Sequence, residues 1–359
     1  MTLKISHRKN TTPCRSNHRR YPQGERAQYG VLFIAYEKYL RNICYRELNE
    51  PESDKKIESI YEIDWNGEFD TVIIGHLRKM SNVLRKDLIT EIIDKCIKYS
   101  KNLYSFDDLR MYEERLNTLR RNGQKAFYFL LKEEEIINNT FGGLHHISCP
   151  VLAVCGTSSR QGKFNLQLEL KRRLSDLGYA VGQLGTEPTS FLLGMDSMLP
   201  VGYESTVQLQ PETIVRYINQ ELHKMDKNEI IIIGTQSQTL PYGYGNLGFL
   251  TFSQHSILTA AEPDAVVLCV NIDDEFEYIA RNISYVSSCF FAPVVALCLF
   301  PYHKNMEWNI NYSNSKKITE DEIMRYKTLA WEQFRLPVFV NGEDDEMNEL
   351  INCIINFFG

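Results

Sequence analysis

Residues 156–163 carry the strongest chemical signal in the sequence. They read Gly-Thr-Ser-Ser-Arg-Gln-Gly-Lys, two glycines and a lysine in the order of a Walker A phosphate-binding loop, with five residues between the glycines where that motif has four. Glycines let the backbone curl so that successive N–H groups point inward, and a lysine ammonium neutralises the outer phosphates of a nucleotide. The apolar run 149–155 precedes the loop and a helix-compatible stretch follows it, so the positive end of that helix would face the anion. We therefore predict that the loop binds phosphate. The competing interpretation is a glycine-rich turn between a strand and a helix.

The prediction assigns the whole loop and the two residues after it to nucleotide binding: Gly156, Thr157, Ser158, Ser159, Arg160, Gln161, Gly162, Lys163, Phe164 and Asn165. Lys163 is also the expected catalytic cation. Arg160 is either a second cation for the phosphates or a solvated surface arginine. Phe164 stands where a Walker A loop has the serine or threonine that holds Mg²⁺. Binding of ATP or another nucleotide is therefore predicted ahead of Mg²⁺ binding and hydrolysis.

Polar segments that follow other predicted strands are candidates for the rest of a site, because ligands of a parallel sheet bind beyond the carboxyl ends of its strands. Glu187 and Asp196 follow the strand at 179–184, and either carboxylate is a candidate to hold Mg²⁺ or to act as a base. We assign Glu187 to catalysis and both residues to the metal.

The loop after the predicted strand 229–234 offers amide and hydroxyl groups that suit a carboxylate, an amide or a peptide, unless these groups only cap the loop. The candidate substrate-binding residues are Gln236, Ser237, Gln238 and Tyr242. After the next strand, Asn271, Asp273 and Asp274 are candidates to contact a nucleotide base, although capping of a helix is the commoner use of such aspartates.

An alternation of apolar strands and helices predicts that residues 145–359 form a P-loop NTPase-like α/β domain, a parallel sheet wrapped by helices. The expected strands are 149–155, 179–184, 229–234, 265–270, 293–300 and 336–340, and the expected helices include 165–177 and 345–358.

Residues 29–144 predict a smaller Rossmann-like domain with a helical linker. The expected elements are strands at 29–35, 69–75 and 102–106, an amphipathic helix at 84–98 and a polar helical stretch from 107 to about 139. No Gly-x-Gly-x-x-Gly follows the first of these strands, so a docking or scaffold role is preferred to dinucleotide binding. Residues 1–28 carry seven Lys and Arg against one acid and predict a disordered basic tail.

Composition favours a folded protein whose partners are small molecules or peptides. The chain has 359 residues, enough for two domains, and is 43% hydrophobic and 24% charged. A net charge of -6 gives no general attraction to nucleic acid or to an anionic membrane, and no segment approaches the roughly 18 to 20 apolar residues of a membrane span. Nine scattered cysteines without a CxxC pair indicate reduced thiols and a cytoplasmic location. A homo-oligomer is compatible with these features.

Four segments together resemble a P-loop family that includes D-glutamate N-acetyltransferase: 156–165, 181–185, 234–241 and 262–269. The resemblance covers about residues 148–300, extends more loosely to the first domain, and at the loop also includes dethiobiotin synthetase. It implies ATP, or coenzyme A, as the bound nucleotide. The sequence departs from the family pattern by having Ser158 in place of Asp, Asn165 in place of Thr and Ile233 in place of an acid, which removes expected metal ligands.

A second resemblance, to P-loop-like proteins of peptide natural-product maturation, rests on residues 162–164, 185–188 and 237–241 as a set. It implies a peptide substrate. Two hypotheses follow from these patterns. The first is an ATP- or acyl-CoA-dependent transferase or ligase that acts on an amino acid or peptide, and the second is a non-catalytic accessory protein of a peptide maturation system. Phe164 and the missing acid favour the second hypothesis.

Overall fold

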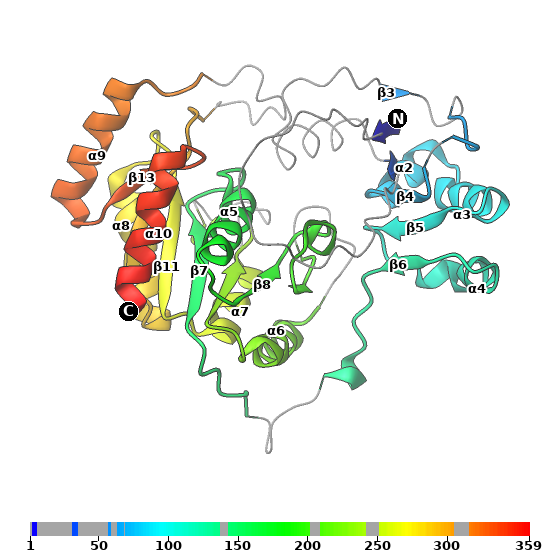
Figure 1. The fold of residues 1–359 in the computed structure, drawn as a ribbon, viewed down its shortest axis with the longest axis horizontal. Coiled ribbons are helices and arrows are strands. Elements are labelled where there is room, and N and C mark those ends of the chain that lie inside the picture. Colours follow the sequence, from blue (N-terminus) through cyan, green and yellow to red (C-terminus); the bar gives the residue numbers. More distant parts are fainter. Residues whose placement is uncertain are drawn as a thin grey trace. The chain divides into compact units, whose positions relative to one another are not determined.

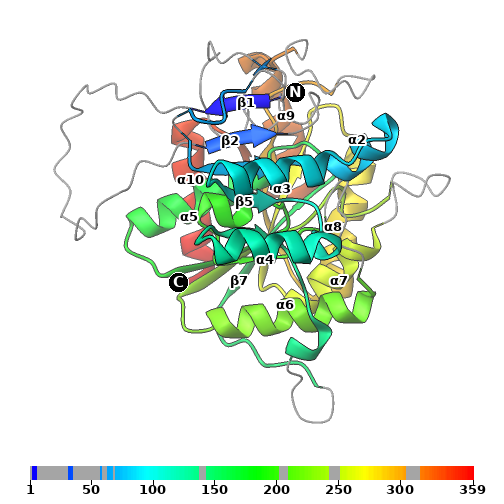
Figure 2. The same cartoon turned by 90° about the vertical axis from the view of Figure 1, so that its right-hand side faces the viewer.

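The computed structural model describes residues 2–5, 31–34, 57–58, 63–67, 69–136, 143–201, 209–241, 251–304 and 316–359. Two compact units divide the chain, Met1–Leu130 and Leu131–Gly359, and each has its own sheet and helices (Figures 1 and 2). The sequence places the domain boundary at 144/145, whereas the units divide at 130/131. No helix in the described ranges combines the length and apolar character that crossing a membrane requires.

The first unit is built on a six-stranded sheet whose strand order is β3-β1-β2-β4-β5-β6. The strands are β1 (Thr2–Ile5), β2 (Val31–Ile34), β3 (Ile57–Glu58), β4 (Thr71–Ile74), β5 (Asn102–Ser105) and β6 (Ala126–Tyr128). The last four strands along this order, from β2 to β6, are parallel, as the Rossmann-like prediction requires. Strand β1 pairs antiparallel to β2 and β3, so residues 2–5, which the sequence places in the tail, belong to the sheet. The rest of the predicted tail lies outside the described residues.

Helices α2 (Leu77–Leu84), α3 (Leu88–Lys98) and α4 (Glu113–Arg121) accompany this sheet. Helix α3 buries apolar side chains at steps of three and four residues, Ile89, Ile92, Ile93 and Cys96, in one core with strands β4 and β5. It begins at Leu88 and not at residue 84 as predicted, because the Asp87 carboxylate caps it by accepting a hydrogen bond from the Thr90 N–H.

The prediction of a helix over residues 107–139 was wrong. Helix α4 ends before Gly123, which has a φ of +83°, and β6 follows and pairs with β5. The polar surface of α4 suggested a longer helix in the sequence. The three residues of β6 are too few to show a strand pattern.

A carboxylate of the chain occupies the N-terminus of α2, the place where many Rossmann-like domains bind phosphate. Asp107 Oδ2 accepts hydrogen bonds from the N–H groups of Leu77 (2.6 Å) and Arg78 (3.1 Å). Burial raises the pKa of Asp107, which is opposed by these bonds and by nearby positive charge. The anion site of this helix is therefore satisfied from within the unit.

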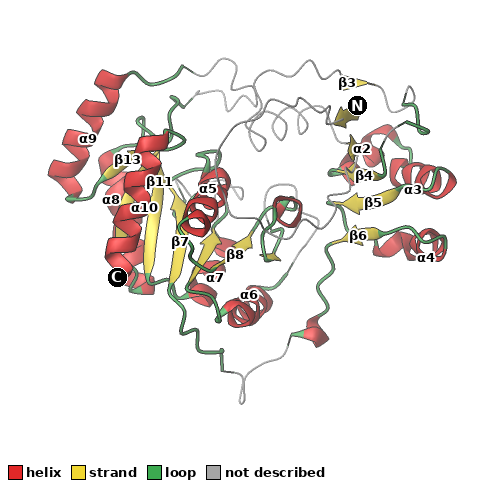
Figure 3. Cartoon of the chain, viewed as in Figure 1, coloured by secondary structure: helices red, strands yellow, loops and turns green. Residues whose placement is uncertain are grey.

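The second unit contains a seven-stranded sheet in the order β13-β12-β11-β7-β10-β8-β9, and all its strand pairs are parallel (Figures 1 and 3). The strands are β7 (Val151–Gly156), β8 (Val181–Gly185), β9 (Ser197–Met198), β10 (Ile230–Gly234), β11 (Ala265–Val270), β12 (Val294–Leu299) and β13 (Val338–Val340). Every residue of β7, β8, β10 and β11 is buried, which explains the continuous apolar sequences of β7, β10 and β11; β8 also contains the buried Gln183.

Helices cover both faces of this sheet. They are α5 (Lys163–Asp176), α6 (Pro211–Met225), α7 (Phe252–Ala261), α8 (Phe276–Phe290), α9 (Glu320–Phe334) and α10 (Asp344–Phe358). Helices α5 and α10 lie on one face, where their leucines and isoleucines share a core with alternate residues of the strands, and α7 and α8 lie on the other face (Figure 1). The predicted fold class, a parallel sheet wrapped by helices, is confirmed. The two-residue strand β9 was not predicted.

Candidate functional site

The predicted phosphate loop lies between β7, the central strand of the larger sheet, and α5. Strand β7 ends at Gly156 and helix α5 begins at Lys163, two residues earlier than the sequence predicts. Gly162 has a φ of +72° and Arg160 a φ of +60°, so the backbone turns through the left-handed region twice within three residues. Such turns bring successive N–H groups to the concave side of a loop, which is the arrangement that binds anions.

The absence of a Cβ atom at Gly156 makes room for two side chains that fold back over it. A Cβ atom there would lie 2.7 Å from Gln161 Oε1, 2.9 Å from Lys163 Cδ and 3.2 Å from Lys163 Nζ. Both side chains therefore occupy the inside of the loop. The glycine that the motif demands is explained by this close approach and not by its φ.

The Lys163 ammonium points into the loop. Its Nζ donates a hydrogen bond of 2.7 Å to the Ser158 carbonyl oxygen, and the side chain is only 7% exposed. Burial lowers the pKa of Lys163 to about 8, an effect that nearby Glu187 opposes. A desolvated cation inside a ring of backbone N–H groups is the electrostatic basis of phosphate binding.

A buried polar network braces the loop from the carboxyl end of β11. Thr157 donates its hydroxyl proton to Asp274 Oδ2, which also accepts the Asn271 N–H at 2.8 Å. Lys304 forms an ion pair with the other oxygen of Asp274. Asn271 Nδ2 donates to Ser158 Oγ at 3.2 Å. Asn271 and Asp274, predicted to contact a base or cap a helix, thus hold the loop itself.

Two further strand ends and helix α8 also reach the loop. Thr239, after β10, donates its N–H to the Gly156 carbonyl oxygen at 2.7 Å. The Tyr278 hydroxyl, on α8, lies 3.0 Å from the Thr157 carbonyl oxygen and 2.5 Å from that of Leu240. Asn341, after β13, lies 3.4 Å from the carbonyl oxygens of Gln161 and Gly162. Carboxyl-end loops from both sides of β7 therefore converge on residues 156–163.

Glu187 lies at the end of β8 and interacts electrostatically with Lys163. Burial raises the pKa of its carboxyl group, while a hydrogen bond from Gln236 and the charge of Lys163 lower it. Gln236 Nε2 lies 3.0 Å from Glu187 Oε1 and 2.9 Å from the Thr186 carbonyl oxygen. Gln236, predicted to bind substrate, therefore orients Glu187.

The other predicted residues lie in different surroundings. The exposed Asp196 accepts hydrogen bonds from Lys171 Nζ (2.8 Å) and from the Gln183 N–H (2.9 Å), so its carboxylate is engaged beside the middle of β8. Gln238 is buried, and Ser237 has a φ of +53°. Tyr242 lies outside the described residues.

Metal ligands near the loop are few. The Thr157 hydroxyl is bound to Asp274, the Ser158 hydroxyl accepts from Asn271, and Phe164 follows the lysine. Among the described residues, no group of three or more His, Cys, Asp or Glu side chains is arranged to hold a metal ion.

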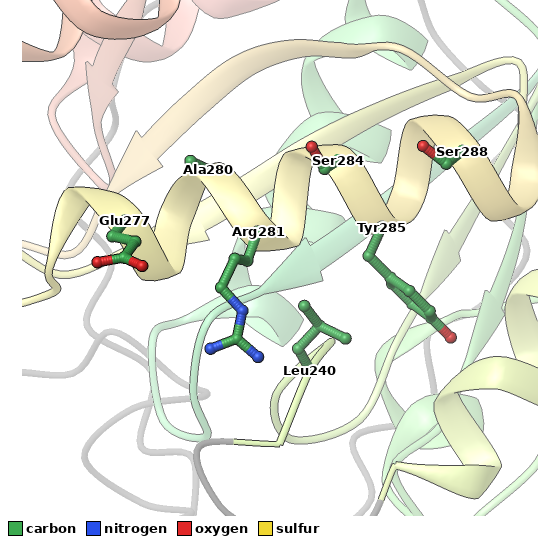
Figure 4. Close-up of a pocket in the computed structure, with 7 residues that line it drawn as sticks. All are labelled: Leu240, Glu277, Ala280, Arg281, Ser284, Tyr285 and Ser288. Atoms are coloured by element: carbon green, nitrogen blue, oxygen red, sulfur yellow. The ribbon is translucent and has the colours of Figure 1, made fainter.

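An open hollow of about 470 Å³ lies beside α8, lined by Leu240 of the loop after β10 and by side chains of the helix (Figure 4). Arg281 and Tyr285 extend from α8 toward the side on which Leu240 lies, and Ser284 and Ser288 add hydroxyl groups to the rim. Because Leu240 and the phosphate loop share the Tyr278 hydroxyl, this hollow is linked directly to the loop.

Sequence reasoning did not single out Tyr278, Lys304 or Asn341. Tyr278 and Lys304 lie in segments without a motif, and only the folded sheet brings them to the loop. The position of Asn341 directly after a predicted strand was the one available signal.

A parallel sheet whose central strand runs into a glycine-bounded loop with a buried lysine, followed at once by a helix, defines a P-loop domain. The chain belongs to the family described as "Domain of unknown function (DUF1611_C) P-loop domain", whose model matches residues 139–345, more than half of the chain.

Several solved structures are similar to this chain. A DUF1611 family protein from Anabaena variabilis is 14% identical, with a TM-score of 0.54 over 80% of each chain. A nucleotide-binding protein from Archaeoglobus fulgidus in complex with ADP is 12% identical, with a TM-score of 0.38 over 56% of this chain and 84% of that chain. Cobyrinic acid a,c-diamide synthase from Mycobacterium smegmatis, with bound ADP and magnesium, is 14% identical, with a TM-score of 0.35 over 53% of this chain and 84% of that chain. No curated protein matches the sequence.

Proposed function

We propose that residues 156–163 bind the phosphates of a nucleoside di- or triphosphate, and that the protein is a nucleotide-dependent transferase or ligase acting on an amino acid or peptide. The observation that carries the proposal is Lys163, whose ammonium is buried inside a loop that two left-handed turns and the start of α5 surround. ATP and ADP are the first ligands to test.

In this proposal, Lys163 and the loop N–H groups stabilise negative charge that develops on a transferring group, which is how P-loop enzymes accelerate phosphoryl transfer. Mg²⁺, if bound with the nucleotide, would neutralise charge between the phosphates. Glu187 would hold it or act as a base, since its raised pKa makes it a better proton acceptor than an exposed carboxylate. Gln236 would keep the Glu187 carboxylate in place.

The acceptor would bind where the loop after β10 meets α8. Residues 235–241 contact both the Gly156 carbonyl oxygen, through Thr239, and the hollow beside α8, through Leu240. Arg281 offers a guanidinium group to the carboxylate of an amino acid or peptide. Both resemblances imply such an acceptor. The first family includes an enzyme that acetylates an amino acid, and the second resemblance implies a peptide substrate.

Glu187→Gln is expected to lower the affinity of the nucleotide complex for Mg²⁺ by at least about tenfold, since a metal site loses 10- to 100-fold when a supporting group is removed. Binding of ADP without Mg²⁺ is expected to stay unchanged. Asp196→Asn is the matched control, because that carboxylate is engaged with Lys171 and should leave Mg²⁺ binding intact. Titration calorimetry with and without Mg²⁺ measures both; equal Mg²⁺ affinities in wild type and Glu187→Gln would remove Glu187 from the metal site.

ADP affinity is expected to fall as the pH rises above about 8. The folded, ligand-free protein has a Lys163 pKa of about 8, so the ammonium that phosphate requires is present below this pH and is lost above it. The fall should approach about tenfold per pH unit, one proton being taken up on binding. Lys163→Arg should show a flat profile because guanidinium stays charged. A flat wild-type profile between about pH 7 and 10 would contradict this assignment.

A second function, a non-catalytic accessory protein of a peptide maturation system, is favoured by Phe164 and by the engaged hydroxyls of Thr157 and Ser158. Turnover separates the two functions. Wild-type protein and Lys163→Ala would be assayed for ATP hydrolysis and for acetyl transfer from acetyl-CoA to amino acids. Equal rates in the two proteins, together with an ADP affinity that does not depend on Mg²⁺, would contradict the enzyme proposal and support the accessory role.

A further inference from the structure

The side chain of Gln161 lies inside the phosphate loop. It is 1% exposed, and its Oε1 accepts a hydrogen bond of 2.9 Å from the Ser158 N–H. Its Nε2 donates to Thr157 Oγ1 at 2.5 Å and lies 3.5 Å from Asp274 Oδ2. The carboxamide is thus held at both ends, with its oxygen toward a backbone N–H group of the loop.

The carboxamide oxygen of Gln161 uses a hydrogen-bond donor that a bound phosphate oxygen would also use. A Cβ atom on Gly156 would lie 2.7 Å from Gln161 Oε1 and 3.2 Å from Lys163 Nζ, so both side chains reach over the end of β7. A phosphate oxygen in a P-loop also requires an inward N–H group and the lysine ammonium. In this structure Gln161 takes the N–H group, and Lys163 is turned onto the Ser158 carbonyl oxygen.

We propose that Gln161 is an internal competitor for the phosphate cradle, an autoinhibitory contact that a polyphosphate must displace before it binds. This inference rests on the proposed nucleotide binding. On displacement, the Ser158 N–H exchanges the carboxamide oxygen for a phosphate oxygen, and Lys163 exchanges the Ser158 carbonyl for the anion. Loss of these internal contacts opposes binding, so wild-type affinity is weaker than the cradle alone would give.

Asp274 and Lys304 set the strength of this contact. The Asp274 carboxylate accepts a hydrogen bond from Thr157 and lies 3.5 Å from the carboxamide Nε2 through the same oxygen, and its other oxygen forms an ion pair with Lys304. The competitor is therefore tied to the loops after β11 and β12.

The test is titration calorimetry of the full chain with ADP, with thermal unfolding as a check on folding. Gln161→Ala is expected to bind ADP about tenfold more tightly than wild type, which corresponds to about 1.4 kcal/mol. Gln161→Glu, which puts a carboxylate of the same length in the cradle, is expected to bind at least about tenfold more weakly. Gln167→Ala is the matched control, because Gln167 is an equally buried glutamine, on α5, whose side-chain Nε2 donates to the Lys163 carbonyl oxygen and not to the loop before the helix, and the ADP affinity of this variant should not rise.

The direction in which Gln161→Ala changes the ADP affinity decides between the proposal and its alternatives. A brace that shapes the loop would make folded Gln161→Ala bind ADP more weakly, and a bystander would leave the affinity unchanged; either result would overturn the proposal while leaving nucleotide binding established. Absence of ADP binding in wild type, Gln161→Ala and Lys163→Ala alike would instead remove the proposed function itself. Binding that appears only in Gln161→Ala would support both.

Discussion

Lys163→Ala is expected to weaken ADP binding by at least about 100-fold. The variant removes an ammonium group that is buried inside the loop. Its Nζ donates a hydrogen bond of 2.7 Å to the Ser158 carbonyl oxygen, at the place where phosphates would enter. Hydrogen bonds to charged groups contribute about 1.5 to 3 kcal/mol each, and loss of two such contacts to phosphate corresponds to about 100-fold or more. Titration calorimetry near pH 7 measures the change.

Lys171→Ala provides the matched control for this variant. Lys171 lies on the same helix, α5, but its ammonium bonds to Asp196 and to the Gly194 carbonyl oxygen, away from the loop. Its loss should leave ADP affinity within about twofold of wild type, since surface ion pairs contribute little. Equal effects of the two substitutions would show that Lys163 has no special role in phosphate binding.

Gly162→Ala is expected to destabilise the P-loop domain and to abolish ADP binding. The backbone of Gly162 is left-handed, with a φ of +72°, and a Cβ atom would lie 2.6 Å from Asn341 Nδ2. The left-handed conformation costs a non-glycine residue about 1–2 kcal/mol, and the displaced Asn341 also loses its contacts with the loop carbonyl oxygens. We expect a total loss of at least about 2 kcal/mol in the free energy of unfolding.

Gly178→Ala separates the two contributions. Gly178, just after α5, has a φ of +98° and nothing within 4 Å of its hypothetical Cβ, so alanine there meets the backbone penalty without a clash. Urea unfolding of both variants should show a larger loss for Gly162→Ala, and only that variant should lose ADP. If the two substitutions were equally destabilising, the contact with Asn341 would contribute nothing.

The larger sheet was predictable because its buried parallel strands are continuous apolar runs. Strand β11 begins at Ala265 and ends at Val270, as predicted, and the other predicted strands differ from the observed ones by a few residues at their ends. The phosphate loop was predictable for a different reason. A Gly-Lys pair directly at the start of a helix, with a glycine at the end of the preceding strand, indicates a phosphate loop even though five residues and not four separate the glycines.

The hydrogen-bond partners of the polar residues near the loop could not be predicted from the sequence. Gln236 and Asp196 are polar residues after strands, and their types alone could not reveal that one orients Glu187 while the other bonds to Lys171. Asp274 was predicted to contact a base or cap a helix because its position after β11 suits either role. Only the structure shows that its carboxylate bonds to Thr157, which lies 117 positions earlier in the chain.

The contact between Asn341 and the loop has a consequence for synthesis of the chain. Asn341 lies 180 positions after Gln161, and Lys304 and Asp274 also follow the loop by more than a hundred residues. While the ribosome is still making β12, the segment from β7 to α5 already exists but lacks Lys304 and Asn341. The loop therefore gains the contacts of Asn341, and the ion pair between Lys304 and its partner Asp274, only after the residues up to Asn341 have been made.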